Sequence, residues 1–367
     1  MKGRVLHFPQ RSISLEQGRA AADRVLEVPI PERVARVRDL QLEEPETLLS
    51  LCGRLRERWE TAPASVRDDA VFLYRFIDEP KRSIGLFDER DYFLGETALI
   101  AGTACRFLGL RPEARRWFDR SEAAFRHTMN PVAEWSRLSY QRLALRAEER
   151  EFEEIFELAP SLTQSFVKLE MPEDALKCRF LEAVALKETE KFAESCRAFE
   201  EICRDAETLG NRKLQGIARY NLVQIHSLLG EADKAILESQ KAFPLLKEQQ
   251  NRVGIAKLQW GLGYLLRDQG DLAGAIEIFR KAQQEFGEIG MRADMAAIQL
   301  VIADLLLDSG DEVQAEKEIL AALPIIEELK MVPEGVAAIA LLRESVRQRS
   351  INRQVLRDLH GYFEELA

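Results

Sequence analysis

Turn-forming residues and long apolar runs are both scarce in this sequence of 367 residues. It holds 20 glycines and 13 prolines, about 9% of the chain against roughly 12% in average usage, which argues against an all-β fold. The longest obvious apolar run, residues 336–342, is far shorter than the ~20 residues that a membrane-spanning helix needs. We therefore expect no membrane segment.

Positive charge and paired cysteines are lacking too. The net charge is −10, so the overall basic footprint of a nucleic-acid-binding protein is missing and we do not expect a nucleic-acid partner. The five cysteines are odd in number and form no C-x-x-C pair, which is typical of reduced thiols in a cytosolic protein. Residues 1–10 hold no apolar stretch of the kind that a secretory signal needs. The sequence therefore predicts a cytoplasmic location.

Motifs that carry catalytic or cofactor chemistry are also missing. The chain has no G-x-x-x-x-G-K-[ST], no H-E-x-x-H and no G-x-S-x-G. Gly261 and Gly263 begin a dinucleotide-like pattern, but Leu266 stands where the third glycine belongs. The four histidines show no metal-ligand spacing among themselves or with the cysteines. The sequence predicts that the protein is not an enzyme and has no cofactor and no metal site.

Internal repetition is the strongest positive feature. The length alone suggests two or three domains, but Gly230, Gly270 and Gly310 recur at a constant spacing of about 40 residues, each followed by an acidic residue. Each unit has the apolar periodicity of two helices, and in one of them Gly270 ends the first helix and Asp271 caps the second. We expect about six units of roughly 40 or 41 residues over residues 91–330. Small residues such as Gly263 recur midway along the helices, facing large ones such as Phe279, which lets antiparallel helices interlock.

A resemblance to a known family follows from residues 262–282, which contain the pattern L-G-x-x-L-x-x-x-G-D-x-x-x-A-x-x-x-F-x-x-A. This pattern resembles a tetratricopeptide repeat (TPR) of the longer, about 40-residue type. The likeness covers about two thirds of the chain and is weaker near residues 132–210, where Arg150 and Glu190 replace the loop glycine. It implies an all-α fold, a right-handed α-solenoid of stacked helix-turn-helix repeats whose first helices line a concave surface.

Three segments are expected on this basis. Residues 1–90 form an N-terminal helical segment, which is a cap, a degenerate repeat pair or a small helical domain. Residues 91–349 form the TPR-like array of about six units plus an extra helix, and residues 350–367 form a C-terminal capping helix.

An aromatic row marks the candidate binding surface, because one position on the first helix is aromatic in successive units. Aromatic side chains dominate binding hot spots, so the row could hold an extended or helical peptide; the alternative is packing between neighbouring first helices. Polar neighbours make the surface mixed and slightly basic, which suits an acidic or amphipathic partner. The candidate partner-binding residues are Tyr140, Phe180, Tyr220, Gln224, Lys257, Trp260, Tyr264 and Arg267.

A second row with the same spacing consists of Arg212, Arg252 and Arg292, each at the entry to a first helix. Stacked guanidinium groups could bind carboxylates or phosphates. The alternative is that each arginine pairs with a local acid across the joint between repeats.

Together these features predict a non-catalytic protein–protein interaction scaffold or adaptor that binds a peptide or helix of a partner protein in the concave groove. The alternative is a regulatory sensor that responds to a ligand or peptide in signalling or transcription control, as long-repeat members of the family often do. The feature that would favour a sensor is an attached effector domain, and none is evident unless residues 1–90 contain one.

Overall fold

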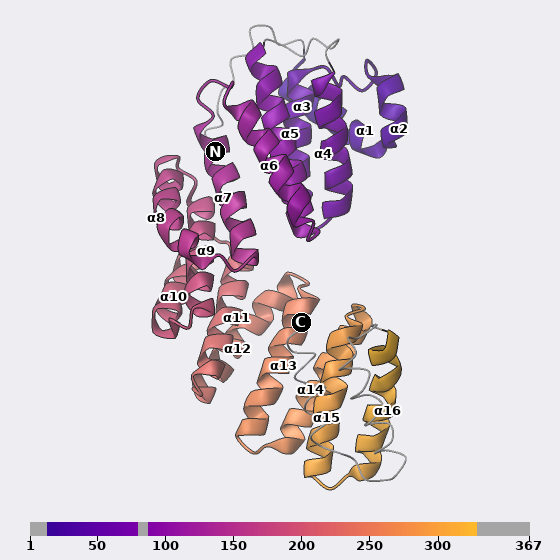
Figure 1. The fold of residues 1–367 in the computed structure, drawn as a ribbon, viewed down its shortest axis with the longest axis vertical. Coiled ribbons are helices and arrows are strands. Elements are labelled where there is room, and N and C mark those ends of the chain that lie inside the picture. The colour runs from indigo at the N-terminus through magenta and orange to yellow at the C-terminus, as the bar shows by residue number, and fades with distance from the viewer. Residues whose placement is uncertain (1–12, 80–86, 329–367) are drawn as a thin grey trace. The chain divides into compact units, whose positions relative to one another are not determined.

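The computed structural model describes residues 13–79 and 87–328, and every regular element in those ranges is a helix (Figure 1). The all-α prediction is thus confirmed for this part of the chain. The predicted extra first helix near residues 333–348 and the predicted capping helix at residues 350–367 lie outside the described residues. The elements are α1 (Leu15–Glu27), α2 (Ile30–Arg33), the short 3-10 helix η1 (Val34–Arg36), α3 (Pro45–Arg58), α4 (Pro63–Asp78), α5 (Phe87–Phe107), α6 (Arg111–Phe125), α7 (Val132–Glu148), α8 (Phe152–Lys168), α9 (Pro172–Glu188), α10 (Phe192–Thr208), α11 (Arg212–Leu228), α12 (Ala232–Glu248), α13 (Arg252–Asp268), α14 (Leu272–Glu288), α15 (Arg292–Asp308) and α16 (Glu312–Glu328).

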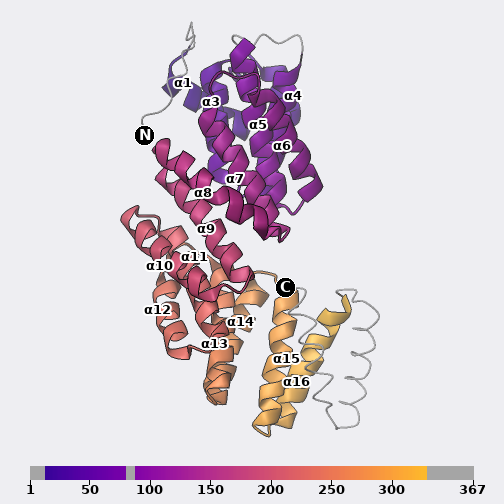
Figure 2. The same cartoon turned by 60° about the vertical axis from the view of Figure 1, so that its left-hand side comes forward.

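The helices from α7 to α16 repeat with a strict period. Each is 17 residues long, and each begins at the same offset from the start of the helix before it. Two helices with their turns therefore span the distance in sequence between successive loop glycines such as Gly230 and Gly270. With the earlier pair α5–α6, the described residues hold six helix pairs, and the partners in pairs such as α13–α14 and α15–α16 pack side by side (Figures 1 and 2).

The turns between these helices share one backbone conformation. Gly270 has a φ of 84°, and the next residue, Asp271, donates its backbone N–H to the Leu266 carbonyl at 2.9 Å, which closes the end of α13. The Asp271 side chain then accepts from the backbone N–H three residues on, which caps α14. Arg150 and Glu190, which replace the glycine, still adopt a positive φ of 63° and 61°. The repeat geometry therefore imposes a left-handed conformation on residues that disfavour it.

Close approach within a helix pair depends on glycine facing phenylalanine. A Cβ atom at Gly263 in α13 would lie 2.5 Å from a ring carbon of Phe279 in α14, and one at Gly102 in α5 would lie 2.6 Å from the ring of Phe118 in α6. Both phenylalanines are fully buried. The predicted packing of small against large residues is confirmed at these two pairs.

The chain divides into two compact units, residues 1–185 and residues 186–367. In the first unit, α1, α3, α4 and α5 share one apolar core, which includes Leu51, Leu73 and Phe93. The buried pair Arg33–Asp69, with nitrogen and oxygen 2.7 Å apart, fastens α2 to α4. In the second unit, apolar clusters run through α11–α13 and α13–α16. No helix among the described residues is both long and apolar enough to cross a membrane.

Candidate functional site

The predicted partner-binding residues all lie on first helices of the pairs, but they divide between the two units. The second unit holds six of the eight. Tyr140 on α7 and Phe180 on α9 belong to the first unit, whereas Tyr220 and Gln224 on α11 and Lys257, Trp260, Tyr264 and Arg267 on α13 belong to the second.

A polar network joins the last turn of α9 to α11. Lys187 donates from Nζ to Asn221 Oδ1 at 3.0 Å and to Gln224 Oε1 at 2.8 Å. Gln224 in turn donates from Nε2 to the Tyr220 hydroxyl at 2.9 Å. The nearest carboxylate, Glu188, is 3.5 Å from Lys187 Nζ. Burial lowers the pKa of Lys187 and raises the pKa of Tyr220 to about 12. The network therefore holds a partly desolvated cation mainly through neutral amide oxygens.

Trp260 belongs to the core. It is 9% exposed and packs edge-on against Phe286 of α14, with ring centroids 5.6 Å apart. Its indole Nε1 has no hydrogen-bond partner within the described residues. Little of the Trp260 surface is therefore open to a partner, which favours the packing alternative for this residue.

The other predicted residues of α13 reach the surface. Tyr264 is half-buried, with its ring edge-on to Phe279 at 5.2 Å between centroids, while the guanidinium of Arg267 lies 4.7 Å from the centroid of its ring. Arg267 is exposed and also pairs with Asp268. Lys257 lies two turns before Tyr264 and is half-buried; within residues 13–79 and 87–328 its ammonium has no ion-pair partner. Helix α13 therefore carries two cationic side chains and one aromatic side chain that are at least partly exposed.

The two predicted residues of the first unit are half-buried. Tyr140 packs against the cluster that contains Leu143 and Phe152, and burial raises the pKa of its hydroxyl above the usual value. Phe180 lies on α9, close to the end of the first unit.

Two members of the arginine row, Arg212 and Arg252, form local ion pairs. Arg212 Nε donates to Glu248 at 2.7 Å, and Arg252 Nε donates to Glu285 at 2.9 Å. Each bond joins the start of a first helix to the later part of its own second helix. The local-acid alternative therefore holds for these two arginines, but the pairing is within a helix pair rather than across the joint between repeats.

Sequence reasoning missed a cavity of about 600 Å³ in the first unit. It is lined by residues of α2, η1, α4 and α6, including the apolar Phe72, Phe76 and Trp117 and the charged Arg67 and Glu113. These residues lie at or before the first helix pair, where the repeat pattern gives little guidance. The sequence predicts α4 from its hydrophobic periodicity alone. Periodicity does not show where neighbouring helices move apart and leave a cavity.

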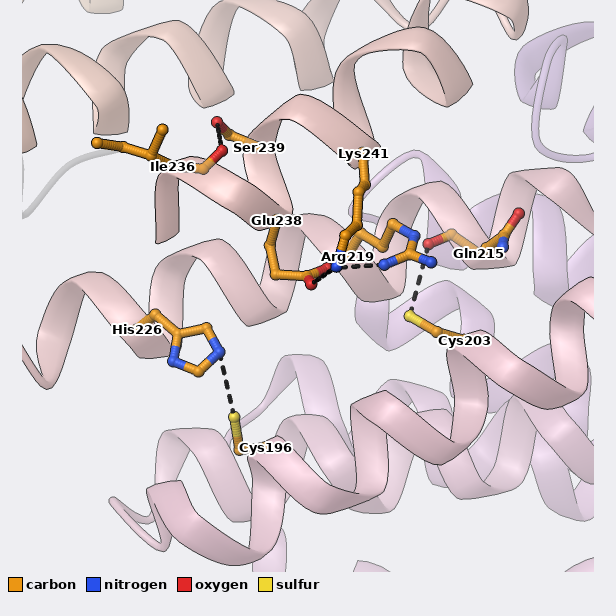
Figure 3. Close-up of polar contacts among 9 residues, drawn as sticks. All are labelled: Cys196, Cys203, Gln215, Arg219, His226, Ile236, Glu238, Ser239 and Lys241. Atoms are coloured by element: carbon orange, nitrogen blue, oxygen red, sulfur yellow. Dashed lines mark hydrogen bonds and ion pairs between the residues drawn. The ribbon is translucent and has the colours of Figure 1, made fainter. Parts of the chain in front are cut away.

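A cluster of Cys196, His226 and Glu231 was also missed, and Figure 3 shows Cys196 beside His226. Cys196 Sγ on α10 lies 3.7 Å from His226 Nε2 on α11, and His226 Nδ1 lies 2.7 Å from Glu231 Oε2. Cys203, two turns later on α10, is buried, whereas Cys196 is half-buried. No spacing rule links a cysteine on one helix to a histidine on the next. In the described residues, no group of three or more side chains is arranged to hold a metal ion.

Comparison with known proteins gives matches among solved structures. No protein-family model and no curated protein sequence matches the chain. Aspartyl phosphate phosphatase F from Bacillus subtilis matches with a TM-score of 0.59 and 13% identity, over 100% of this chain and 95% of that one. A signal transduction ATPase with a tetratricopeptide repeat sensor, from Pyrococcus horikoshii, matches with a TM-score of 0.57 and 14% identity, over 86% of this chain and 48% of that one. The fold of this chain is that of a TPR-type helical repeat protein.

A third match to the TPR-type chain is the Rap conjugation gene regulator of the plasmid pLS20, in complex with the Phr* peptide. Its TM-score is 0.56 at 13% identity, over 96% of this chain and 95% of that one. The predicted TPR resemblance and the predicted α-solenoid class are confirmed. At such identities the likeness concerns the fold alone. One match is described as a phosphatase, so the absence of enzymatic activity stays a prediction, as does the cytoplasmic location.

Proposed function

We propose that this protein is a non-catalytic regulatory binding protein that holds a short peptide on the first-helix face of its second unit. The peptide carries a carboxylate and at least one apolar side chain. The observation that carries the proposal is the network in which Lys187 is held by Asn221 and Gln224 instead of by a tight carboxylate pair.

The residues of this face supply the three kinds of contact that a short peptide needs. The side-chain amide of half-buried Gln224 can exchange hydrogen bonds with a peptide backbone, because it carries both donors and an acceptor. Lys257 supplies a cation for a carboxylate, and the half-buried rings of Tyr220 and Tyr264 supply apolar area. This combination supports a peptide over a nucleic acid, which would need a larger excess of basic residues.

The regulatory part of the proposal is supported by the fold comparison, in which one similar structure is a gene regulator bound to a peptide. A plain adaptor, which holds a segment of a larger protein without any response, is the second candidate. The two candidate functions differ in the ligand that each needs. A regulator of this kind binds the free peptide, whereas an adaptor binds the same segment only as part of its parent protein.

Selection from a random pool of short synthetic peptides tests the proposal. The pool is passed over the immobilised full chain, and the retained peptides are identified by mass spectrometry. A second pool, in which carboxamides replace all carboxylates, is the matched control. We expect retention of acidic peptides with apolar residues from the first pool and about tenfold less from the second. No retention from either pool, or equal retention from both, contradicts the proposal.

A further inference from the structure

A nucleophile, a base and a carboxylate meet at Cys196, His226 and Glu231. We propose that Cys196 is a site of reversible S-thiolation, where its thiol exchanges with a low-molecular-weight disulfide while His226 accepts the thiol proton. The proposal goes beyond peptide binding and does not depend on it.

The geometry orders the three groups. Glu231 Oε2 lies 2.7 Å from His226 Nδ1, so the carboxylate holds the proton on that nitrogen. The lone pair of Nε2 is then free to accept, and Cys196 Sγ lies 3.7 Å from it. A nucleophile within reach of a base, with the base oriented by a third group, is the arrangement that activates cysteine and serine in many proteins.

Access distinguishes Cys196 from the other cysteines. Cys52, Cys105, Cys178 and Cys203 are buried, whereas Cys196 is half-buried. Cys203 is a built-in comparison, because it lies two turns later on α10 and contacts the carbonyl of Gln215 at 4.0 Å instead of an imidazole (Figure 3). The two thiols therefore share a helix but differ in exposure and in the neighbouring base.

The exchange is balanced without a further oxidant. The Cys196 sulfur attacks one sulfur of the disulfide R–S–S–R, a new S–S bond forms, and the old S–S bond breaks. His226 Nε2 takes the thiol proton and transfers it to the departing R–S⁻, which leaves as R–SH. The products are the mixed disulfide at Cys196 and one free thiol, and an excess of small thiol reverses the reaction.

The charges around Cys196 make the base necessary. Glu200 of α10, together with Glu231, Glu238 and Lys234 around the start of α12, faces the thiol, and burial and the three carboxylates raise the pKa of Cys196 to about 11. Burial likewise raises the pKa of Cys203 to about 11. At pH 7, such a thiol is ionised in about one molecule in ten thousand. Exchange at Cys196 thus requires proton removal by His226, and among the described residues no histidine contacts Cys203.

The test measures the rate of mixed-disulfide formation at each cysteine of the full chain with glutathione disulfide, by mass spectrometry of peptides. We expect Cys196 to react first, and His226→Gln to slow it by about tenfold or more, since a positioned base contributes at least that much. Reaction of Cys196 no faster than Cys203, or an unchanged rate in His226→Gln, would overturn the proposal.

Two further variants keep the test decisive even where His226→Gln disturbs folding. Glu231 has two opposite effects: its charge repels a thiolate at Cys196, and its carboxylate orients His226. If the thiolate reacts without help from a base, Glu231→Gln speeds the exchange. If His226 removes the proton, Glu231→Gln slows the exchange. Its side chain is 36% exposed, which makes the substitution tolerable. Glu200→Gln is the matched control, because it removes the same charge from exposed Glu200 on α10. A slower rate for Glu231→Gln with an equal or faster rate for Glu200→Gln supports the proposal, and faster rates for both overturn it.

Discussion

Lys187 of α9 donates a hydrogen bond of 2.8 Å to Gln224 of α11, so the cation of one helix pair is held by a neutral amide of the next. The side chain of Lys187 is 15% exposed, and its pKa is lowered mainly by desolvation, although Glu188 acts in the opposite direction. The desolvated ammonium of Lys187 lowers the stability of the fold, and the same positive charge is available to attract an anionic ligand.

The first prediction concerns pH. Because the pKa of Lys187 is lower in the folded state than in the unfolded state, folding disfavours its charged form at neutral pH. The cost is full below the folded-state pKa and disappears as the pH rises past the unfolded-state value of about 10.5. Lys187→Met removes this dependence. Between about pH 7 and about pH 10, we expect the urea midpoint of the wild type to rise relative to that of Lys187→Met. The same change in midpoint for both proteins would contradict this prediction.

The second prediction compares two glycines of α13. A Cβ at Gly263 would lie 2.5 Å from Phe279, whereas nothing lies within 4 Å of a Cβ at Gly261. We expect Gly263→Ala to destabilise by about 1–3 kcal/mol through overpacking. The matched control, Gly261→Ala, should stabilise by up to ~1 kcal/mol because alanine favours helices. Urea unfolding followed by circular dichroism gives both values, and equal effects would contradict the packing.

The third prediction concerns the turns. Glu190 is exposed and has a φ of 61°, a conformation that costs a non-glycine residue about 1–2 kcal/mol. After allowing for the greater entropy of glycine in the unfolded chain, Glu190→Gly should stabilise by about 0.5–1 kcal/mol. Gly270→Ala, at the equivalent position two units later with a φ of 84°, should destabilise by a similar amount or more. Thermal unfolding of both variants checks the opposite signs.

The fourth prediction separates core from surface on α13. Trp260 packs on Phe286, so Trp260→Ala should cost about 3–5 kcal/mol of unfolding free energy. Lys257→Ala on the same helix should change it by no more than ~0.5 kcal/mol. A melting temperature that stays unchanged in Trp260→Ala would return this residue to the binding surface.

The sequence predicts the repeat frame well, because the frame is local. Gly270 and Asp271 define a turn through backbone conformation and capping, and the same turn recurs at fixed spacing. Whether an individual residue of a first helix is buried or exposed is not set by its local sequence. The pattern places Trp260 on a first helix, but its burial depends on Phe286 and the following pair, whose Ala296 belongs to the same cluster.

The network and the thiol cluster are harder still to predict. Lys187 and Gln224 are 37 residues apart, and Cys196 and His226 are 30 apart. Each pair meets only because successive helices stack at a particular rotation. The signal that could have suggested the first contact is a polar residue near the end of one first helix and an amide in the second half of the next.

The most direct measurement of the central claim is the dissociation constant of a peptide retained from the random pool, measured by fluorescence anisotropy. The test variant Lys257→Ala/Arg267→Ala removes two cations from α13, and the matched control Lys241→Ala/Lys281→Ala removes two exposed cations from the second helices α12 and α14. The account predicts that the test variant weakens binding by about tenfold or more, while the control stays within about twofold of the wild type. Equal weakening by both variants, or none by the test variant, would contradict it.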